Sequence, residues 1–160
     1  MSVQNSYSVY HGEKYAGQVI NLIDSVSRYN GTGAAIPFGY AVVSDVSDGA
    51  GKAKLPTPTD TALTFEGIAM REVNRAYGPN DTFGAVDGQD FTVITAAGKV
   101  AVVAGATVDL NDAVYFGVGA DVAGKFTNAA GAGVTAAVPI PKAKFLEAGD
   151  EDDIVWVKFS

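Results

Sequence analysis

The sequence contains no cysteine. Disulfide bonds and thiolate metal sites are therefore excluded, and the fold must be held by packing and by hydrogen bonds between strands. The chain has 11 Lys plus Arg against 18 Asp plus Glu, without a basic cluster, so nucleic acid is not an expected partner. No apolar run approaches the ~18 residues of a membrane span. Residues 1–7 lack the basic start and apolar centre of a signal peptide, so we expect a product that is made in a cytoplasm and either used there or assembled there into something larger, with no membrane partner.

The chain also lacks the residue patterns of a catalytic centre. His11 is the only histidine, and no G-x-S-x-G turn accompanies it, so a solvated or interface histidine is the favoured interpretation. The acidic residues at 45 and 48 resemble part of a calcium loop, but Pro56 stands where the bidentate Glu belongs. The acidic run 150–153 favours a solvated turn over a site for a hard cation. We predict no catalytic residue, no cofactor and no metal site, and therefore no enzyme.

The 160 residues present are enough for one domain with a well-buried core. Hydrophobic residues make up 48% of the chain, and there are 19 glycines. Short β-branched and aromatic runs are separated by Gly, Asn and Asp, which is typical of strands joined by turns. We therefore predict an all-β fold, a compact β-barrel or β-sandwich of jelly-roll or tulip-like form, with an extended N-terminal arm.

The predicted strands lie mainly between residues 36 and 159. Residues 91–95 and 99–103 are expected to form a hairpin that turns at Ala97-Gly98. In the last strand, Ile154, Trp156 and Lys158 alternate with Val155, Val157 and Phe159, so the two sets face opposite ways. We expect this strand, with the only Trp, to be locked into the sheet. The other expected strands are 36–43, 65–73 and 114–118, with a long polar loop at 44–64.

Residues 1–30 differ from the rest, and we assign them to an N-terminal arm that precedes a single β domain at 31–160. The segment 18–26 fits either one face of a helix or an extended strand. Residues 1–30 could also include the first strand of the core, and the sequence leaves both alternatives open. Tyrosine is enriched at protein interfaces, so the arm supplies the candidate contacts with a partner protein or with other protomers. These candidates are Tyr7, Tyr10, His11, Tyr15, Val19, Ile20, Leu22 and Ile23.

The succession of motifs from Gly17 onward resembles the capsid cement, or decoration, proteins of tailed bacteriophages. No single motif is specific, and the resemblance rests on their order over about four-fifths of the chain. Two positions depart mildly from the family pattern, namely Val102 in the hairpin return and Asn111 in the turn before Val114. The motifs are Ile36-Pro37-Phe38-Gly39-Tyr40-Ala41-Val42-Val43, Phe65-Glu66-Gly67-Ile68-Ala69, Phe91-Thr92-Val93-Ile94 with Gly98-Lys99-Val100-Ala101-Val102, Asn111-Asp112-Ala113-Val114-Tyr115-Phe116, Gly124-Lys125-Phe126-Thr127, Ala143-Lys144-Phe145-Leu146 and Ile154-Val155-Trp156-Val157.

This resemblance implies a structural protein without catalytic activity. It implies a homotrimer, assembled in the host cytoplasm, on the outer capsid surface of the virion. The implied partners are the major capsid protein and other copies of the same chain. Each trimer would clamp the junctions between major capsid protein subunits and stabilise the expanded head. The alternative is a carbohydrate- or receptor-binding module of the virion surface, which would need an exposed aromatic platform outside the arm.

Overall fold

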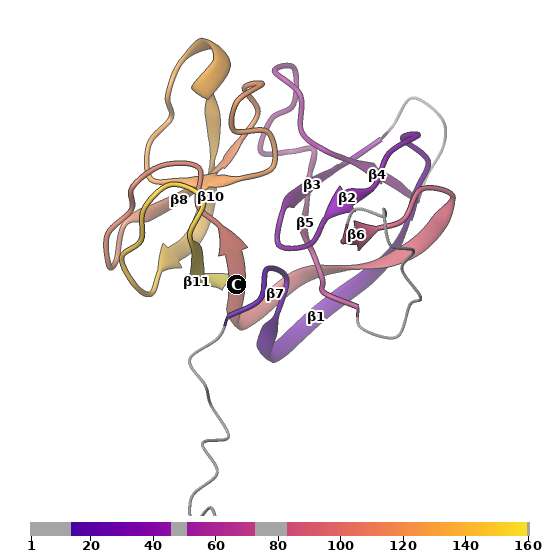
Figure 1. Ribbon diagram of the computed structural model, residues 1–160, viewed down its shortest axis with the longest axis horizontal. Helices are drawn as coiled ribbons and strands as arrows, with labels where there is room; N and C mark the ends of the chain where they lie inside the picture. The colour runs from indigo at the N-terminus through magenta and orange to yellow at the C-terminus, as the bar shows by residue number, and fades with distance from the viewer. Residues whose placement is uncertain (1–13, 46–50, 73–82, 160) are drawn as a thin grey trace, which may run out of the picture.

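A computed structural model describes residues 14–45, 51–72 and 83–159 of the chain (Figure 1). This part of the chain contains no α-helix, and its only helical turn is the 3₁₀ helix η2 (Gly133–Thr135). The all-β prediction is confirmed. The strands are β1 (Val19–Asn30), β2 (Ile36–Pro37), β3 (Ala41–Ser44), β4 (Lys52–Lys54), β5 (Phe65–Ala69), β6 (Gly84–Ala85), β7 (Gln89–Val103), β8 (Ala113–Gly117), β9 (Phe126–Thr127), β10 (Ala137–Phe145) and β11 (Ile154–Phe159).

The strand pairings form one closed ring and one open extension. β1 pairs with β4 along one edge and with β7 along the other, and β4, β3, β5 and β7 are neighbours in turn. These five strands therefore close on themselves as a small barrel. On the edge away from β1, the second half of β7 pairs with β11, which continues the sheet to β10, β8 and β9. Figure 1 shows the two halves side by side, with β7 running between them.

The strands shared by the two halves are buried on both faces. Val42, Ala69 and Val93 belong to one core cluster. Their chain neighbours Val43, Ile68 and Ile94 belong to a larger cluster that includes residues of β8, β10 and β11. Side chains of adjacent strand residues point to opposite faces. This burial explains why these segments are continuously apolar rather than alternating.

The hairpin predicted over residues 91–103 is wrong, because these residues form one continuous strand, β7. The two arms of a hairpin would pair with each other, whereas here they pair with β1 on one edge and with β5 and β11 on the other. Gly98 serves this arrangement without a turn. A Cβ atom at Gly98 would lie 3.1 Å from the Cβ of Asn21, so glycine permits the close approach of β1.

The arm predicted over residues 1–30 does not extend to Asn30 in the structure. Residues 19–30 are strand β1, which pairs with residues 89–100 of β7, so the alternative of a first core strand holds for this part. The pairing register shifts between Leu22 and Ser25, and Asn21 has a positive φ of 56°. These irregularities disturb the alternation of the side chains. They explain why the sequence fits a helical face as well as a strand.

Other boundaries shift in smaller ways. The strand expected at 36–43 is divided into β2 and β3 by a turn in which Gly39 has a φ of +76°. The loop expected at 44–64 contains the short strand β4. The last strand is confirmed, since Val155, Val157 and Phe159 are buried. Trp156, on the opposite face, is only partly buried.

Candidate interface

The segment that leads into β1 is fixed to the domain by backbone hydrogen bonds on two sides. The Gly17 amide donates to the Ala101 carbonyl at 2.8 Å, and the Arg71 amide donates to the Gly17 carbonyl at 2.9 Å. The Ala101 amide also donates to the carbonyl of Gln18 at 2.8 Å. Gly17 therefore bridges β7 and the end of β5, and it marks where the N-terminal segment meets the folded domain.

A second anchor lies three residues earlier, at Lys14. Its Nζ is 2.5 Å from Glu147 Oε1, and each side chain is about one-third exposed (28% and 31%). The same Glu147 oxygen accepts a hydrogen bond from the Trp156 amide at 2.8 Å. The ion pair alone contributes little because water screens it. Its effect is to direct the start of the described chain toward β11.

Tyr15 belongs to a cluster of aromatic and cationic side chains. The Arg71 guanidinium lies 4.1 Å from the centre of the Tyr15 ring and 4.8 Å from that of Phe83. Phe83 in turn meets Phe38 edge to face, with ring centres 5.2 Å apart. Tyr15 and Phe83 are 43% and 45% exposed. Aromatic rings and arginine are the side chains enriched at protein interfaces, so this cluster is a candidate contact surface.

A shallow pocket of about 440 Å³ next to Lys14 and a second of about 410 Å³ next to Tyr15 flank this entry segment. The second is lined by Tyr15, Gln18, Val19, Met70 and Arg71, together with Gly17. Its wall is therefore made by both the aromatic cluster and the start of β1. No group of three or more His, Cys, Asp or Glu able to hold a metal occurs among the described residues.

Three apolar side chains of β1 are exposed, and we define Ile20, Leu22 and Ile23 as the β1 patch. These side chains are 36%, 45% and 64% exposed. On its edge away from β7, β1 pairs with β4 only through Tyr29 and Asn30. Within the described ranges, the stretch 19–28 therefore has no neighbouring strand on that edge. An exposed apolar strand with an open edge is a ready site for association with another chain.

The interface residues predicted from the sequence divide into three groups. Tyr15, Ile20, Leu22 and Ile23 are exposed and lie along one continuous segment. Val19 is partly buried and packs against the larger core cluster. Tyr7, Tyr10 and His11 lie outside the described residues. The sequence analysis missed Arg71 and Phe83, which reach Tyr15 only through the tertiary fold.

The acidic turn at residues 150–153 is tied to the domain by a lysine. Lys125 Nζ lies 2.5 Å from Asp152 Oδ1, and this hydrogen bond is the main reason that the pKa of Lys125 is raised above its ordinary value. The Asp150 amide donates to Asp153 Oδ2 at 2.9 Å, which closes the turn, and Thr107 Oγ1 donates to Asp150 Oδ1 at 3.3 Å. Three of these four acidic side chains therefore have partners within the protein.

In the described part of the chain no helix is long and apolar enough to cross a membrane.

Comparisons with known proteins match the chain to a protein family and to solved structures. The family described as "Structural cement protein (E217 gp24/Pam3 gp6)" matches residues 3–160. A chain from "The capsid of Myoviridae Phage XM1" superposes with a TM-score of 0.69 and 26% sequence identity, over 100% of this chain and 98% of that chain. A chain from "The crystal structure of head fiber gp8.5 N base in bacteriophage phi29" gives a TM-score of 0.39 and 13% identity, over 86% and 93%. No curated protein matches the sequence.

Proposed function

Because the chain belongs to the family of phage structural cement proteins, we propose that it binds the outside of the capsid as a homotrimer. In this role each trimer lies over junctions between major capsid protein subunits and clamps them. The expanded head is then stabilised against the pressure of the packaged DNA. The observation that carries the proposal is the family match over residues 3–160, together with the likeness of the whole chain to a chain of a phage capsid.

The build of the domain supports a mechanical role. β3, β5 and β7 are buried on both faces, and the last strand is enclosed between β7 and β10. A sheet packed on both sides resists deformation because interiors are as dense as organic crystals. The net charge of −7 keeps such a protein soluble while it waits for expanded heads. Its family is structural, and clamping requires no catalysis.

The contacts that we propose lie at the N-terminal side. Tyr7, Tyr10 and His11 precede the anchors at Lys14 and Gly17, and we propose that they contact a capsid subunit or a neighbouring protomer. We propose the β1 patch as the adjoining contact. An interface of standard size buries about 1,600 Å². Three contacts in one trimer act together, so the trimer binds more tightly than any one contact would.

Pelleting tests this proposal. Purified protein is mixed with heads that lack it, in expanded and unexpanded form, and the bound copies per head are counted. We expect saturable binding to expanded heads in multiples of three. Light scattering of the free protein measures its oligomeric state separately. Absence of binding to both head forms would overturn the cement role for this chain, whereas binding by a monomer would overturn only the trimer.

A further inference from the structure

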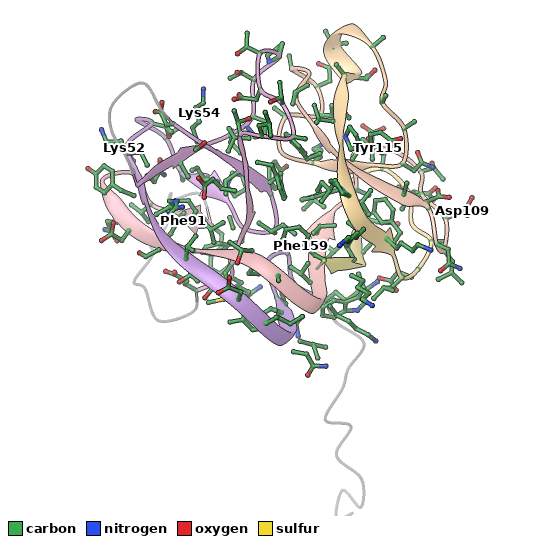
Figure 2. All side chains as sticks on the ribbon, turned by 180° about the vertical axis from the view of Figure 1, so that it is seen from behind. Lys52, Lys54, Phe91, Asp109, Tyr115 and Phe159 are labelled. Atoms are coloured by element: carbon green, nitrogen blue, oxygen red, sulfur yellow. The ribbon has the colours of Figure 1, made fainter. Side chains whose placement is uncertain are left out.

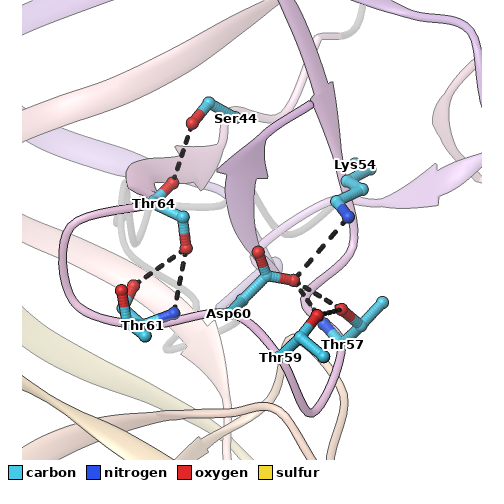
Figure 3. Close-up of polar contacts among 7 residues, drawn as sticks. All are labelled: Ser44, Lys54, Thr57, Thr59, Asp60, Thr61 and Thr64. Carbon is cyan, nitrogen blue, oxygen red and sulfur yellow. Dashed lines mark hydrogen bonds and ion pairs between the residues drawn. The ribbon is translucent and has the colours of Figure 1, made fainter. Parts of the chain in front are cut away.

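The loop between β4 and β5 is held in one shape by two successive turns (Figure 3). In the first, Asp60 Oδ2 accepts hydrogen bonds from the Thr57 amide at 2.9 Å and from Thr57 Oγ1 at 2.7 Å. In the second, Thr64 Oγ1 accepts from the Thr61 amide at 3.1 Å and donates to the Thr61 carbonyl at 2.9 Å. The Asp60 side chain is nearly buried, with 7% of its surface exposed. A loop closed by side chains in this way is already ordered before any partner arrives.

Leu63 stands at the tip of the second turn. Its side chain is 97% exposed, the highest value among the exposed large hydrophobic side chains of the described residues. Its amide donates to Thr61 Oγ1 at 3.3 Å, and the Ser44 amide holds the end of the turn through the Thr64 carbonyl at 2.8 Å. The backbone that carries Leu63 is therefore fixed although the side chain contacts almost nothing. A single exposed leucine is common, but a leucine presented on a preordered turn loses little entropy on binding.

A second loop with the same character projects from the same end of the molecule. Residues 128–136 contain η2, and Val134 within it is 56% exposed. Thr135 Oγ1 donates to the Ala132 carbonyl at 3.1 Å and braces this turn. In Figures 1 and 2, which view the molecule from opposite sides, both loops rise at the end away from the start of β1. We call Leu63 and Val134 with their two loops the loop end.

The two loops of the loop end carry few charges of their own in an acidic protein, although the exposed Asp121 lies next to η2, where its amide donates to the Val134 carbonyl at 3.0 Å. Asp60 is the only charged residue between Lys54 and Glu66, and there is none between Lys125 and Lys142. Asp60 lies 3.8 Å from Lys54 Nζ, so its charge is partly compensated. The turn that carries Leu110 provides the contrast, because Leu110 is 58% exposed but is flanked by Asp109 and, two residues on, Asp112. Depletion of charge is the compositional mark of the centre of a protein interface.

We propose that the loop end docks onto the capsid shell, with Leu63 inserted into an apolar, uncharged depression between shell subunits and Val134 beside it. This inference rests on the proposed function and names the surface that meets the shell. The partner is the shell rather than a second copy because the β1 patch, at the other end, has the open strand edge that suits pairing between copies. The loop end has no such edge in the described chain, and an apolar knob requires a preformed pocket. The loop end then meets the shell, and the β1 patch is left for contacts between copies.

The test is head binding by the variants Leu63→Ser and Val134→Ser, with Leu110→Ser as the matched control. All three replace an exposed apolar side chain on a turn, so the melting temperature should stay near that of the unchanged protein. We expect Leu63→Ser to weaken binding to expanded heads at least tenfold and Val134→Ser to weaken it by a smaller factor. Leu110→Ser should bind as the unchanged protein does. The oligomeric state of all three variants should be unaltered.

Each other outcome overturns the proposal. If Leu63→Ser binds heads as tightly as Leu110→Ser, the loop end does not meet the shell. If Leu63→Ser changes the oligomeric state, the loop end is a contact between copies. If all three variants weaken head binding equally, the binding depends on exposed apolar side chains in general and not on the loop end. Failure of the unchanged protein to bind any head would instead overturn the proposed function, and this inference with it.

Discussion

Gly17 and Gly39 lie back to back where the N-terminal segment crosses the turn between β2 and β3. Their φ angles are +78° and +76°, which L side chains rarely adopt. A Cβ atom on Gly39 would lie 2.7 Å from the Gly17 amide nitrogen, and one on Gly17 would lie 2.7 Å from both the Ala69 oxygen and the Arg71 nitrogen. The crossing therefore exists only because neither residue has a side chain.

We predict that Gly17→Ala lowers the free energy of unfolding by about 2–4 kcal/mol, because the added methyl meets backbone atoms and the left-handed conformation is strained. Denaturant unfolding measures the change. Gly33→Ala is the control, since Gly33 has a φ of +80° but a Cβ atom added there would have no other atom within 4 Å. It should cost only about 1 kcal/mol. Equal losses in the two variants would mean that the crossing does not determine the effect.

The pH dependence of stability should include a contribution from Asp112. The hydrogen bond from Asn128 Nδ2, at 2.7 Å, is the main cause that lowers the pKa of Asp112, followed by the bond from the Asp109 amide at 3.0 Å. A carboxyl whose pKa is lower in the folded state stabilises the fold above its unfolded pKa of 3.8. That contribution is lost as the pH falls from there through the folded pKa.

We predict that Asn128→Ala raises the pKa of Asp112 toward its ordinary value. The free energy of unfolding of this variant should then fall less steeply as the solution becomes more acidic. Carbon-13 titration of the carboxyl group by NMR measures the pKa, and unfolding at several pH values below about 5, where carboxyl groups begin to protonate, measures the stability. Thr107→Val is the control, because the Thr107 hydroxyl bonds Asp150 and leaves Asp112 untouched. An unchanged titration of Asp112 in Asn128→Ala would show that the amide does not set its pKa.

The sequence predicted the fold class because the class depends on local features. The side chains of the last strand alternate between the two faces of the sheet. This alternation placed Val155, Val157 and Phe159 together on one face, which is the buried one. β7 shows where such reasoning fails. Ala97-Gly98 is a plausible turn, and only the positions of β1 and β11, which come from distant parts of the chain, keep the strand continuous.

The candidate interface was predictable only where it is local in sequence. Ile20, Leu22 and Ile23 stand out as apolar residues in a polar segment, and the structure leaves them exposed. Arg71 could not be associated with Tyr15, since their contact depends on the crossing at Gly17. Leu63 was equally hidden, because its exposure depends on which face of a threonine-rich loop points outward.

The β1 patch should serve association and contribute little to folding. We predict that the double variant Leu22→Thr, Ile23→Thr changes the free energy of unfolding by less than about 1 kcal/mol, because threonine keeps the β propensity and both side chains are exposed. The same variant should weaken self-association at least tenfold. Light scattering across a dilution series measures the association. Ser27→Thr, a change to threonine elsewhere on β1, is the control and should associate as the unchanged protein does. If the double variant also associates as tightly as the unchanged protein, the β1 patch is not the contact between copies.

Two truncations should separate the N-terminal arm from the domain. Removal of residues 2–13 leaves Lys14, Tyr15 and Gly17 with their partners, so stability should change by less than about 1 kcal/mol, while head binding weakens if the arm contacts the capsid. Removal of residues 2–18 also deletes the three backbone hydrogen bonds that join this segment to β7 and to Arg71, two at Gly17 and one at Gln18. Each is worth about 0.5–1.5 kcal/mol, so stability should fall by roughly 3 kcal/mol.

Circular dichroism during denaturant unfolding measures both truncations, and pelleting with expanded heads measures attachment. The shorter truncation is the informative one, because it removes Tyr7, Tyr10 and His11 without touching the described fold. A protein that lacks residues 2–13 and unfolds would show that these residues belong to the core. A protein that stays folded and binds heads as before would assign attachment to the domain surface alone. Only weakened binding by a folded domain agrees with an arm that reaches its partner from the anchor at Gly17.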